Sequence, residues 1–313
     1  MGGIQMRKKR KNRFCCLLCF GLCFLLLAGC ENEEGMTLES TNKTTDIVIS
    51  DTDSERSGAE KENGNPPTDS VVTAGTEEYR GFLLDNVLHT EIDGDIHYNI
   101  YIPESYDGSR AYALYLTLPG YEGLYFQGVG VNLESEEFAF EAQKYIENMI
   151  IAAPQLHDWG ETSADQTIAL TEYLINSYNI DISRVYANGY SGGGETMSLV
   201  AGKRPDLFTA YLHISSKWDG AYEPVAESGL PVYLVIGEND EYYGSAPTKD
   251  AYETLYSLYE MQGLSEEEID RLLVLDIKEH SYFSDRGMDN EHAGGGLFAS
   301  DVEIMGWLFS HVK

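Results

Sequence analysis

The sequence predicts an α/β protein in which helices cover both faces of a mostly parallel sheet. Across residues 79–313, short apolar runs of strand length alternate with longer segments whose apolar residues recur at helical spacing. This alternation is typical of a parallel sheet, because a helix usually joins two parallel strands. Two strand-like segments, 81–89 and 95–102, flank the hairpin signal Asp93-Gly94. The sheet should therefore open with an antiparallel pair.

Six further strands are expected at apolar runs that turn residues interrupt. Residues 113–118 end at Pro119-Gly120, and residues 149–153 are stopped by Pro154. Residues 184–190 form a strand that runs into a cluster of glycines. The remaining expected strands are residues 210–215, 231–237 and 272–277.

Helices are expected between these strands. Residues 165–178 carry Ile168, Leu170, Leu174 and Ile175 at helical spacing. A helix over 193–203 closes before a proline, and Ser265-Glu266-Glu267-Glu268 resembles a capping box that opens a short helix. The other expected helices are residues 136–147, 249–262 and 301–311. No internal repeat is present, so residues 79–313 should form one domain.

Residues 1–29 have the organisation of a signal peptide. Six Lys and Arg residues between positions 7 and 13 precede an apolar stretch, 14–28, that is too short for a comfortable transmembrane helix. The stretch ends in Leu27-Ala28-Gly29-Cys30, which resembles the lipobox of bacterial lipoproteins. The resemblance implies that Cys30 is lipidated and anchors the protein to the extracellular face of a bacterial cell membrane. An uncleaved signal anchor is the alternative.

Residues 30–78 are expected to be the lipidated cysteine and a disordered acidic tether. Polar and acidic residues dominate this segment and no apolar period occurs, so it cannot bury enough surface to fold. Without the six basic residues of the leader, 15 basic and 52 acidic residues remain, a formal charge of −37. Such acidity argues against nucleic acid as a partner and limits membrane contact to the anchor. All five cysteines lie at or before Cys30, so the mature body has no thiol beyond the lipidated one.

The segment Gly189-Tyr190-Ser191-Gly192-Gly193 matches the pattern G-x-S-x-G. The pattern alone is weak evidence, but here a strand at 184–188 leads into it and a helix over 194–199 leads out. A serine on such a strand–turn–helix corner has a strained backbone, which small neighbours make tolerable. The corner lifts the hydroxyl to the carboxyl edge of the sheet. Ser191 is therefore the candidate nucleophile, and a glycine-rich turn with an incidental serine is the alternative.

A serine hydroxyl needs a base and an orienting acid to become a good nucleophile. In chain order, this fold supplies the acid next and the histidine last. Asp240 follows the strand 231–237 in a G-x-x-D turn and is the candidate acid, with Glu238 and Glu241 as competitors.

Two histidines follow the last expected strand. His280 comes three residues after that strand, whereas His292 lies on a long loop before the final helix. A base must reach back over the sheet edge to the serine, and the glycines at 294–296 let such a loop turn freely. His292 is therefore preferred over His280 as the base.

An oxyanion needs two backbone N–H donors aimed at the developing charge. The N–H of Gly192, at the start of the helix after the serine, is the natural first donor. The second should come from the loop after the strand 113–118, and Tyr121 is the best candidate there. Aromatic residues near the strands' carboxyl ends are expected to line the substrate pocket: Tyr190, Trp159, Trp218 and Tyr242, with Tyr121, Tyr125 and Tyr243 as further candidates.

Residues 181–208, DISRVYANGYSGGGETMSLVAGKRPDLF, resemble the nucleophile region of α/β-hydrolase esterases. The similar group includes poly(3-hydroxybutyrate)-depolymerase-like, feruloyl and acetyl-xylan esterases together with prolyl-oligopeptidase-like hydrolases. Residues 237–243 and 292–308 resemble that group's acid and histidine segments. One departure is Pro119-Gly120, where many members have His-Gly.

The resemblance implies an α/β-hydrolase fold and ester hydrolysis through an acyl-enzyme, without a metal or other cofactor. Only about fifteen residues separate the strands 210–215 and 231–237, so no large cap domain is expected. An open site favours bulky or polymer-linked esters, such as polysaccharide-linked or phenolic ones. The alternatives are a peptidase of the prolyl-oligopeptidase type and a non-catalytic binding lipoprotein with the same fold.

Overall fold

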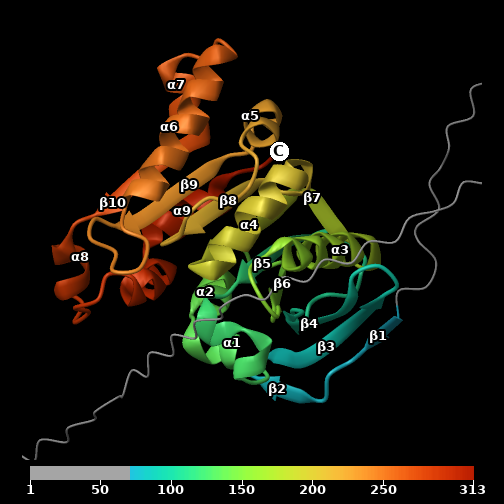
Figure 1. Ribbon diagram of the computed structural model, residues 1–313. Helices are drawn as coiled ribbons and strands as arrows, with labels where there is room; N and C mark the ends of the chain where they lie inside the picture. Colours follow the sequence, from blue (N-terminus) through green and yellow to red (C-terminus); the bar gives the residue numbers. More distant parts are fainter. Residues whose placement is uncertain (1–70) are drawn as a thin grey trace, which may run out of the picture. The chain divides into compact units, whose positions relative to one another are not determined.

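The computed structural model describes residues 71–313. The expected signal peptide, Cys30 and the tether up to residue 70 lie outside the described residues. Within 71–313, a ten-stranded sheet runs through the domain in the order β1-β3-β4-β6-β5-β7-β8-β9-β10, with β2 paired to β3 (Figure 1). The sheet is antiparallel from β1 to β6 and parallel from β6 to β10.

The antiparallel part consists of β1 (Val71–Thr73), β2 (Glu77–Tyr79), β3 (Phe82–Thr90) and β4 (Gly94–Tyr101). The hairpin of β3 and β4 confirms the antiparallel pair predicted from Asp93-Gly94. The predicted end of the tether at residue 78 is wrong, because β1 and β2 already pair with β3. These short strands join the sheet mainly through their backbones, and their largely exposed side chains give no apolar pattern in the sequence.

The parallel part contains six strands, and five of them are buried over most of their length. They are β5 (Tyr112–Leu118), β6 (Met149–Pro154), β7 (Ile180–Tyr190), β8 (Ala210–Ile214), β9 (Val232–Gly237) and β10 (Leu273–Lys278). Only β10, at the edge, is mostly half-buried. Strands buried on both faces carry continuous apolar runs, which is why the sequence located them well.

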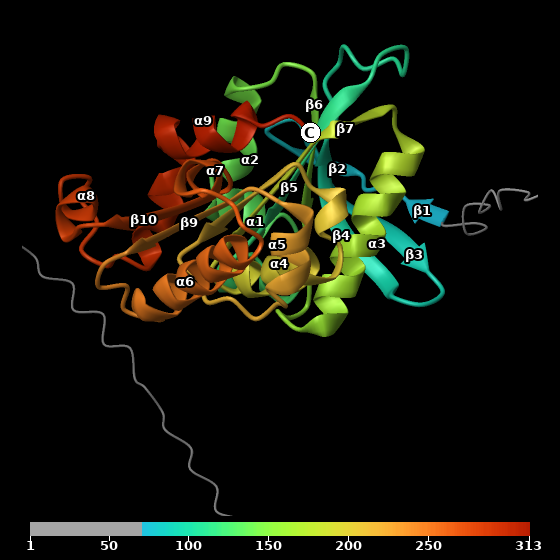
Figure 2. The same ribbon diagram turned by 90° about the horizontal axis from the view of Figure 1, so that it is seen from above.

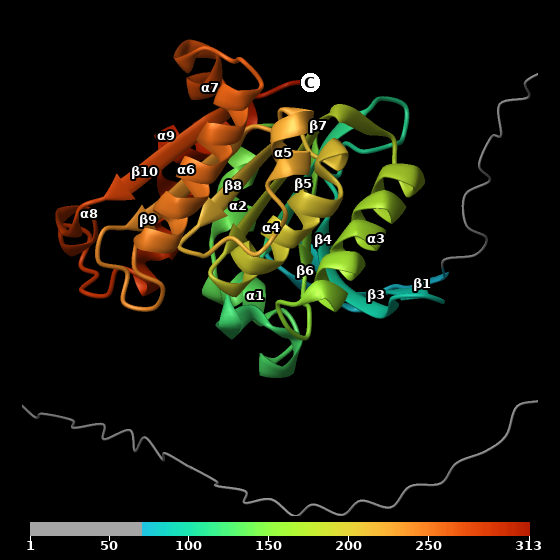
Figure 3. The same ribbon diagram turned by 45° about the horizontal axis from the view of Figure 1, so that its top comes forward.

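Helices cover both faces of the sheet (Figure 2). One face carries α3 (Glu161–Ser177), α4 (Gly192–Lys203), α5 (Glu223–Ser228) and α6 (Ala246–Met261), which stand in front of the sheet in Figure 3. The other face carries α2 (Phe138–Glu141) and α9 (Val302–Ser310). Two separate apolar clusters fill the two sides, as expected when helices sandwich a sheet.

Shorter helices connect these layers. They are α1 (Val131–Ser135), α7 (Glu266–Leu272) and α8 (His280–Ser284), together with 3₁₀ turns at Tyr121–Gly123, Tyr125–Gln127, Ala142–Lys144, Pro205–Leu207 and Ala293–Ser300. The capping box predicted at Ser265 is present at the start of α7. Among residues 71–313, no helix has both the length and the apolar character needed to cross a membrane.

The single helix expected over residues 136–147 is wrong. The chain instead ends α1 at Ser135, forms α2, and finishes with the 3₁₀ turn at Ala142–Lys144. Glu136, the first residue of the expected helix, is not helical: its backbone is extended with φ −134° and ψ 138°. Its side chain is buried, so inward burial of an acid overrides the good helix propensity of glutamate.

Candidate active site

Ser191 stands at the corner between β7 and α4, as the motif predicted. Its backbone has φ 54° and ψ −123°, a strained conformation for a residue with a side chain. The strain is held in place by the surrounding structure, since the Ser191 N–H donates to the carbonyl of Ile214 on β8 at 3.0 Å. The helix α4 starts at the next residue, so its positive N-terminal end faces the site.

Two glycines of the motif are required by close contacts. A Cβ on Gly189 would lie 2.3 Å from the carbonyl oxygen of Gly193. A Cβ on Gly193 would lie 2.4 Å from the carbonyl oxygen of Leu118, at the end of β5. The serine corner and the loop after β5 are therefore in direct backbone contact, which brings the two predicted oxyanion donors to the same place.

Ser191, His292 and Asp240 form a chain of hydrogen bonds. The distance from Ser191 Oγ to His292 Nε2 is 3.0 Å, and that from His292 Nδ1 to Asp240 Oδ2 is 2.8 Å. The Asp240 side chain is fully buried, and its other oxygen accepts the N–H groups of Tyr242 and Tyr243 at 3.0 and 2.8 Å. These bonds fix the carboxylate, which in turn orients the imidazole.

His280, the other candidate base, is bound elsewhere. It begins α8, its side chain is 56% exposed, and its Nδ1 lies 3.0 Å from Oε1 of the buried Glu291. Glu291 also accepts the backbone N–H of Asn239 at 2.7 Å. This pair therefore supports the loop that carries Asp240, and the structure brings His292 rather than His280 to the serine.

The competing acids do not touch the imidazole ring. Glu241 accepts the backbone N–H of His292 at 3.0 Å, which anchors the histidine loop from outside. Glu238 is exposed, and its carbonyl oxygen accepts the Ser245 hydroxyl at 2.9 Å. Only Asp240 meets the imidazole nitrogen.

The two expected oxyanion donors are free to bind a ligand. Within the described residues, no acceptor is assigned to the backbone N–H of Tyr121 or of Gly192. The loop lies against the nucleophile, because a Cβ on Gly120 would be 3.4 Å from Ser191 Cβ. The N–H of Gly120 itself is engaged by Glu136 at 2.8 Å. Of the two N–H groups at the start of this loop, only that of Tyr121 is available.

Two of the four predicted pocket aromatics lie at the site's surface. Tyr242 is 73% exposed, and its ring centroid lies 5.3 Å from that of His292. Trp159 covers the start of α4, since a Cβ on Gly192 would be 1.8 Å from its indole nitrogen. Its ring centroid lies 6.0 Å from that of Tyr121, which is itself half-exposed.

The other two aromatic predictions need correction. Tyr190 is buried beneath the histidine loop, and its hydroxyl donates to the carbonyl of His292 at 2.7 Å. Trp218 is buried against the Tyr222 ring, and its indole N–H donates to Gly220 at 3.0 Å. Tyr190 ends β7 and Trp218 follows β8, as predicted, but both side chains turn inward, so they support the site or the core and do not form a pocket wall.

The sequence analysis missed several charged residues near the site. The hydroxyl of Tyr243 donates to Glu195, in the first turn of α4, and Lys217 Nζ lies 3.5 Å from the same carboxylate. Burial raises the pKa of Tyr243 above its ordinary value, so the phenol stays protonated and remains a donor. An acid three residues inside the helix that follows the serine was the available clue. Glu136 gave no such clue, because it was assigned to the start of an expected helix.

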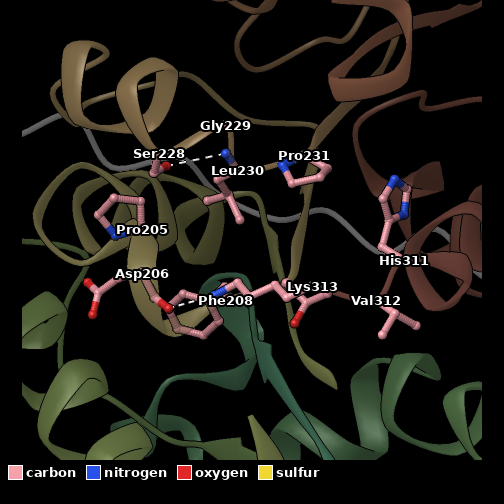
Figure 4. Close-up of a pocket in the computed structure, with 11 residues that line it drawn as sticks. Pro205, Asp206, Phe208, Ser228, Gly229, Leu230, Pro231, His311, Val312 and Lys313 are labelled. Carbon is pink, nitrogen blue, oxygen red and sulfur yellow. Dashed lines mark hydrogen bonds between the residues drawn. The ribbon is translucent and has the colours of Figure 1, made fainter. Parts of the chain in front are cut away.

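A separate pocket lies at the opposite edge of the sheet (Figure 4). It is lined by Pro205, Asp206, Phe208 and Thr209, by residues 228–231 and by residues 311–313, close to where β8 and β9 begin. Ser191 lies at the end of β7, and parallel strands end at one common edge. This pocket is therefore not part of the serine site.

Comparisons with known proteins agree with this architecture. A model of the prolyl oligopeptidase family matches residues 155–263. The crystal structure of a thermostable esterase is similar with a TM-score of 0.60 at 19% identity, over 74% of this chain and 64% of that one. The chain thus spans somewhat less than two thirds of that esterase. No curated protein matches the sequence.

Two other solved structures are also similar. Oligopeptidase B from Leishmania major has a TM-score of 0.48 at 15% identity, over 74% of this chain and 37% of that one. A lipase/esterase from Lactobacillus plantarum has a TM-score of 0.49 at 13% identity, over 72% of this chain and 99% of that one. The likeness to the thermostable esterase shows an α/β-hydrolase fold. The chain thus combines this fold with the Ser–His–Asp hydrogen-bonded arrangement of a serine hydrolase.

Proposed function

We propose that this protein is a serine hydrolase that cleaves carboxylic esters through an acyl-enzyme. The observation that carries the proposal is the chain of hydrogen bonds from Ser191 through His292 to Asp240, beside two unengaged backbone N–H groups. A nucleophile, a base, an orienting acid and oxyanion donors are the parts that acyl transfer needs.

In the first half-reaction, His292 Nε2 takes the Ser191 proton as the oxygen attacks the ester carbonyl. Asp240 holds the imidazole through Nδ1 and stabilises the imidazolium that forms. The N–H groups of Tyr121 and Gly192 then donate to the oxyanion. Each such donor contributes about 3 kcal/mol of transition-state stabilisation in comparable enzymes.

The first half-reaction ends when His292 gives its proton to the leaving alcohol, which departs and leaves the acyl-enzyme. In the second half-reaction, His292 takes a proton from water. The activated water attacks the acyl-enzyme, and collapse of the intermediate returns the proton to Ser191. The same three side chains therefore serve both steps. All the groups used lie on this chain, and no step calls for a metal or other cofactor.

The proposed substrates are polysaccharide-linked or phenolic esters. Exposed aromatic side chains surround the site on two sides: Tyr121 and Phe126 on the loop after β5, and Tyr242 on the loop after β9. Aromatic faces bind sugar and phenol rings well. Between β8 and β9 the chain forms only α5 and its loops, so a bulky substrate could approach.

A panel of model substrates tests the function. We expect turnover of p-nitrophenyl, feruloyl and acetyl-xylan esters and covalent labelling of the protein by a fluorophosphonate probe. Turnover of peptides without turnover of any ester would instead support a peptidase. The match to the prolyl oligopeptidase family favours this alternative. Absence of both turnover and labelling would point to a non-catalytic binding protein.

We also propose that lipidated Cys30 tethers the protein to the outer face of a bacterial cell membrane. The support is the lipobox-like sequence at residues 27–30. Two acyl chains bind stably, since each buried methylene contributes about 0.8 kcal/mol. Cys30→Ser should therefore shift the protein from the detergent phase to the aqueous phase in a partitioning experiment. Unchanged retention in membranes would indicate a signal anchor.

A further inference from the structure

Glu136 is a buried acid that holds the loop carrying one of the proposed oxyanion donors. The residue follows α1, and only 8% of its surface is exposed. Its Oε1 accepts the backbone N–H of Gly120 at 2.8 Å. Gly120 immediately precedes Tyr121, whose N–H is the proposed second donor. Glu136 therefore holds the residue that directly precedes the proposed oxyanion donor in the loop.

The hydrogen bond fixes the direction in which the next N–H points. Gly120 has extended backbone angles, φ −75° and ψ −166°. In extended backbone, successive N–H groups point to roughly opposite sides of the chain. With the Gly120 N–H held by Glu136, the Tyr121 N–H must point away from Glu136. Pro119 has no N–H, so the loop has no earlier backbone donor by which it could be anchored.

The surroundings of Glu136 favour its neutral form. Burial raises the pKa of Glu136 to about 8; the hydrogen bond from the Gly120 N–H opposes this rise, and the nearby carboxylate of Glu122 adds to it. The other titratable groups that face it are the phenols of Tyr115 on β5 and Tyr190 on β7. No ion pair within residues 71–313 includes Glu136. At neutral pH the side chain is thus mostly an uncharged acid.

We infer that Glu136 is a positioning residue, whose hydrogen bond to the Gly120 N–H aims the Tyr121 N–H at the oxyanion. This inference rests on the proposed role of Ser191 as the nucleophile. When Glu136 loses its proton, a negative charge appears beside the place where the oxyanion forms, and like charges repel. A residue that merely satisfied a buried N–H would affect stability but not kcat or its pH profile.

Two substitutions separate these roles. Glu136→Leu removes the acceptor at similar size and should lower kcat on p-nitrophenyl acetate by about 10²–10³-fold with little change in KM, as loss of one oxyanion donor does. Glu136→Gln keeps an acceptor oxygen and should retain most of kcat at neutral pH. The wild-type kcat should fall as pH rises through about 8, whereas Glu136→Gln should lack this fall.

Stability provides a check that the carboxyl titrates as inferred. Because its pKa is raised from 4.5 in the unfolded chain to about 8 in the folded protein, the folded state retains a proton that the unfolded state releases. The carboxyl should therefore make the protein less stable as pH rises from about 4.5 to 8. Melting temperatures of Glu136→Gln should lose this part of the pH dependence. Glu134→Gln, an exposed acid on α1, is the matched control and should behave as the wild type.

Labelling by a fluorophosphonate probe keeps the test independent of the substrate. The phosphonyl oxygen occupies the oxyanion site, so the labelling rate of Glu136→Leu should fall as kcat does. If the wild type is labelled but hydrolyses no ester, the proposed function fails while the inference is still tested by labelling. Wild-type kcat or labelling in a folded Glu136→Leu protein would overturn the inference. If Glu136→Leu does not fold, the pH profile of Glu136→Gln decides. A fall in its kcat at alkaline pH equal to that of the wild type would overturn the inference, and absence of that fall would support the inference.

Discussion

Replacing Ser191 with alanine should lower the rate of ester hydrolysis by about a millionfold in kcat. The hydroxyl lies 3.0 Å from the imidazole of His292, and no second hydroxyl is hydrogen-bonded to that nitrogen within the described residues. Without it no acyl-enzyme can form. A small residual rate should remain, because the oxyanion donors still favour attack by water. The measurement is kcat on p-nitrophenyl acetate, with circular dichroism to verify folding.

The fold should tolerate this substitution. Ser191 has an unfavourable φ of 54°, and alanine at the same angles carries the same backbone strain without a larger side chain. Ser310→Ala, an exposed serine in α9, serves as the control and should retain full activity. Activity of Ser191→Ala above a few per cent of the wild type would reject Ser191 as the nucleophile.

Removing the imidazole of His292 should be nearly as damaging as removing the hydroxyl. The serine and the histidine act as one unit, so kcat should fall by several orders of magnitude in His292→Ala. Asp240 would then be left with a buried carboxylate that lacks its imidazole partner. Loss of such a partner costs stability as well as rate, so the melting temperature should also fall.

His280→Ala is the matched comparison, because it removes the same side chain from the same region of the chain. Its imidazole is half-exposed and contacts only Glu291 among the hydrogen bonds of the described residues. We expect a loss of about 1 kcal/mol in the free energy of unfolding and little change in kcat. If His280→Ala were the inactive variant, the histidine assignment would have to be exchanged.

The order of strands and helices in the parallel half could be predicted closely from the sequence. Runs such as β5 and β9 are buried on both faces, so nearly every residue in them is apolar. The edge strands β1 and β2 escaped prediction, because they pair through backbone groups that all residues share. Expecting one helix over 136–147 failed because the burial of Glu136 is a tertiary effect.

The position of the candidate serine could be predicted from local sequence. The corner at Ser191 is a local feature, since the strand, the glycines and the helix that form it are consecutive in the chain. The preference for His292 over His280 came from loop length and glycine content, which limit how far a segment can reach. The serine corner and the reach of the histidine loop depend on residues that are neighbours in the chain, so periodicity and turn chemistry were enough to predict their positions.

The contacts of the side chains around the serine could not be predicted from local sequence. Tyr190, Trp218 and Tyr242 all lie near the carboxyl ends of strands, yet the first two are buried and Tyr242 is 73% exposed. The contact between Glu136 and Gly120 joins residues sixteen positions apart, and no periodicity encodes it. The physical reason is that burial and hydrogen bonding across elements depend on how the sheet and its loops pack. Packing of distant segments sets the direction of each side chain, and local sequence sets only its place along the strand.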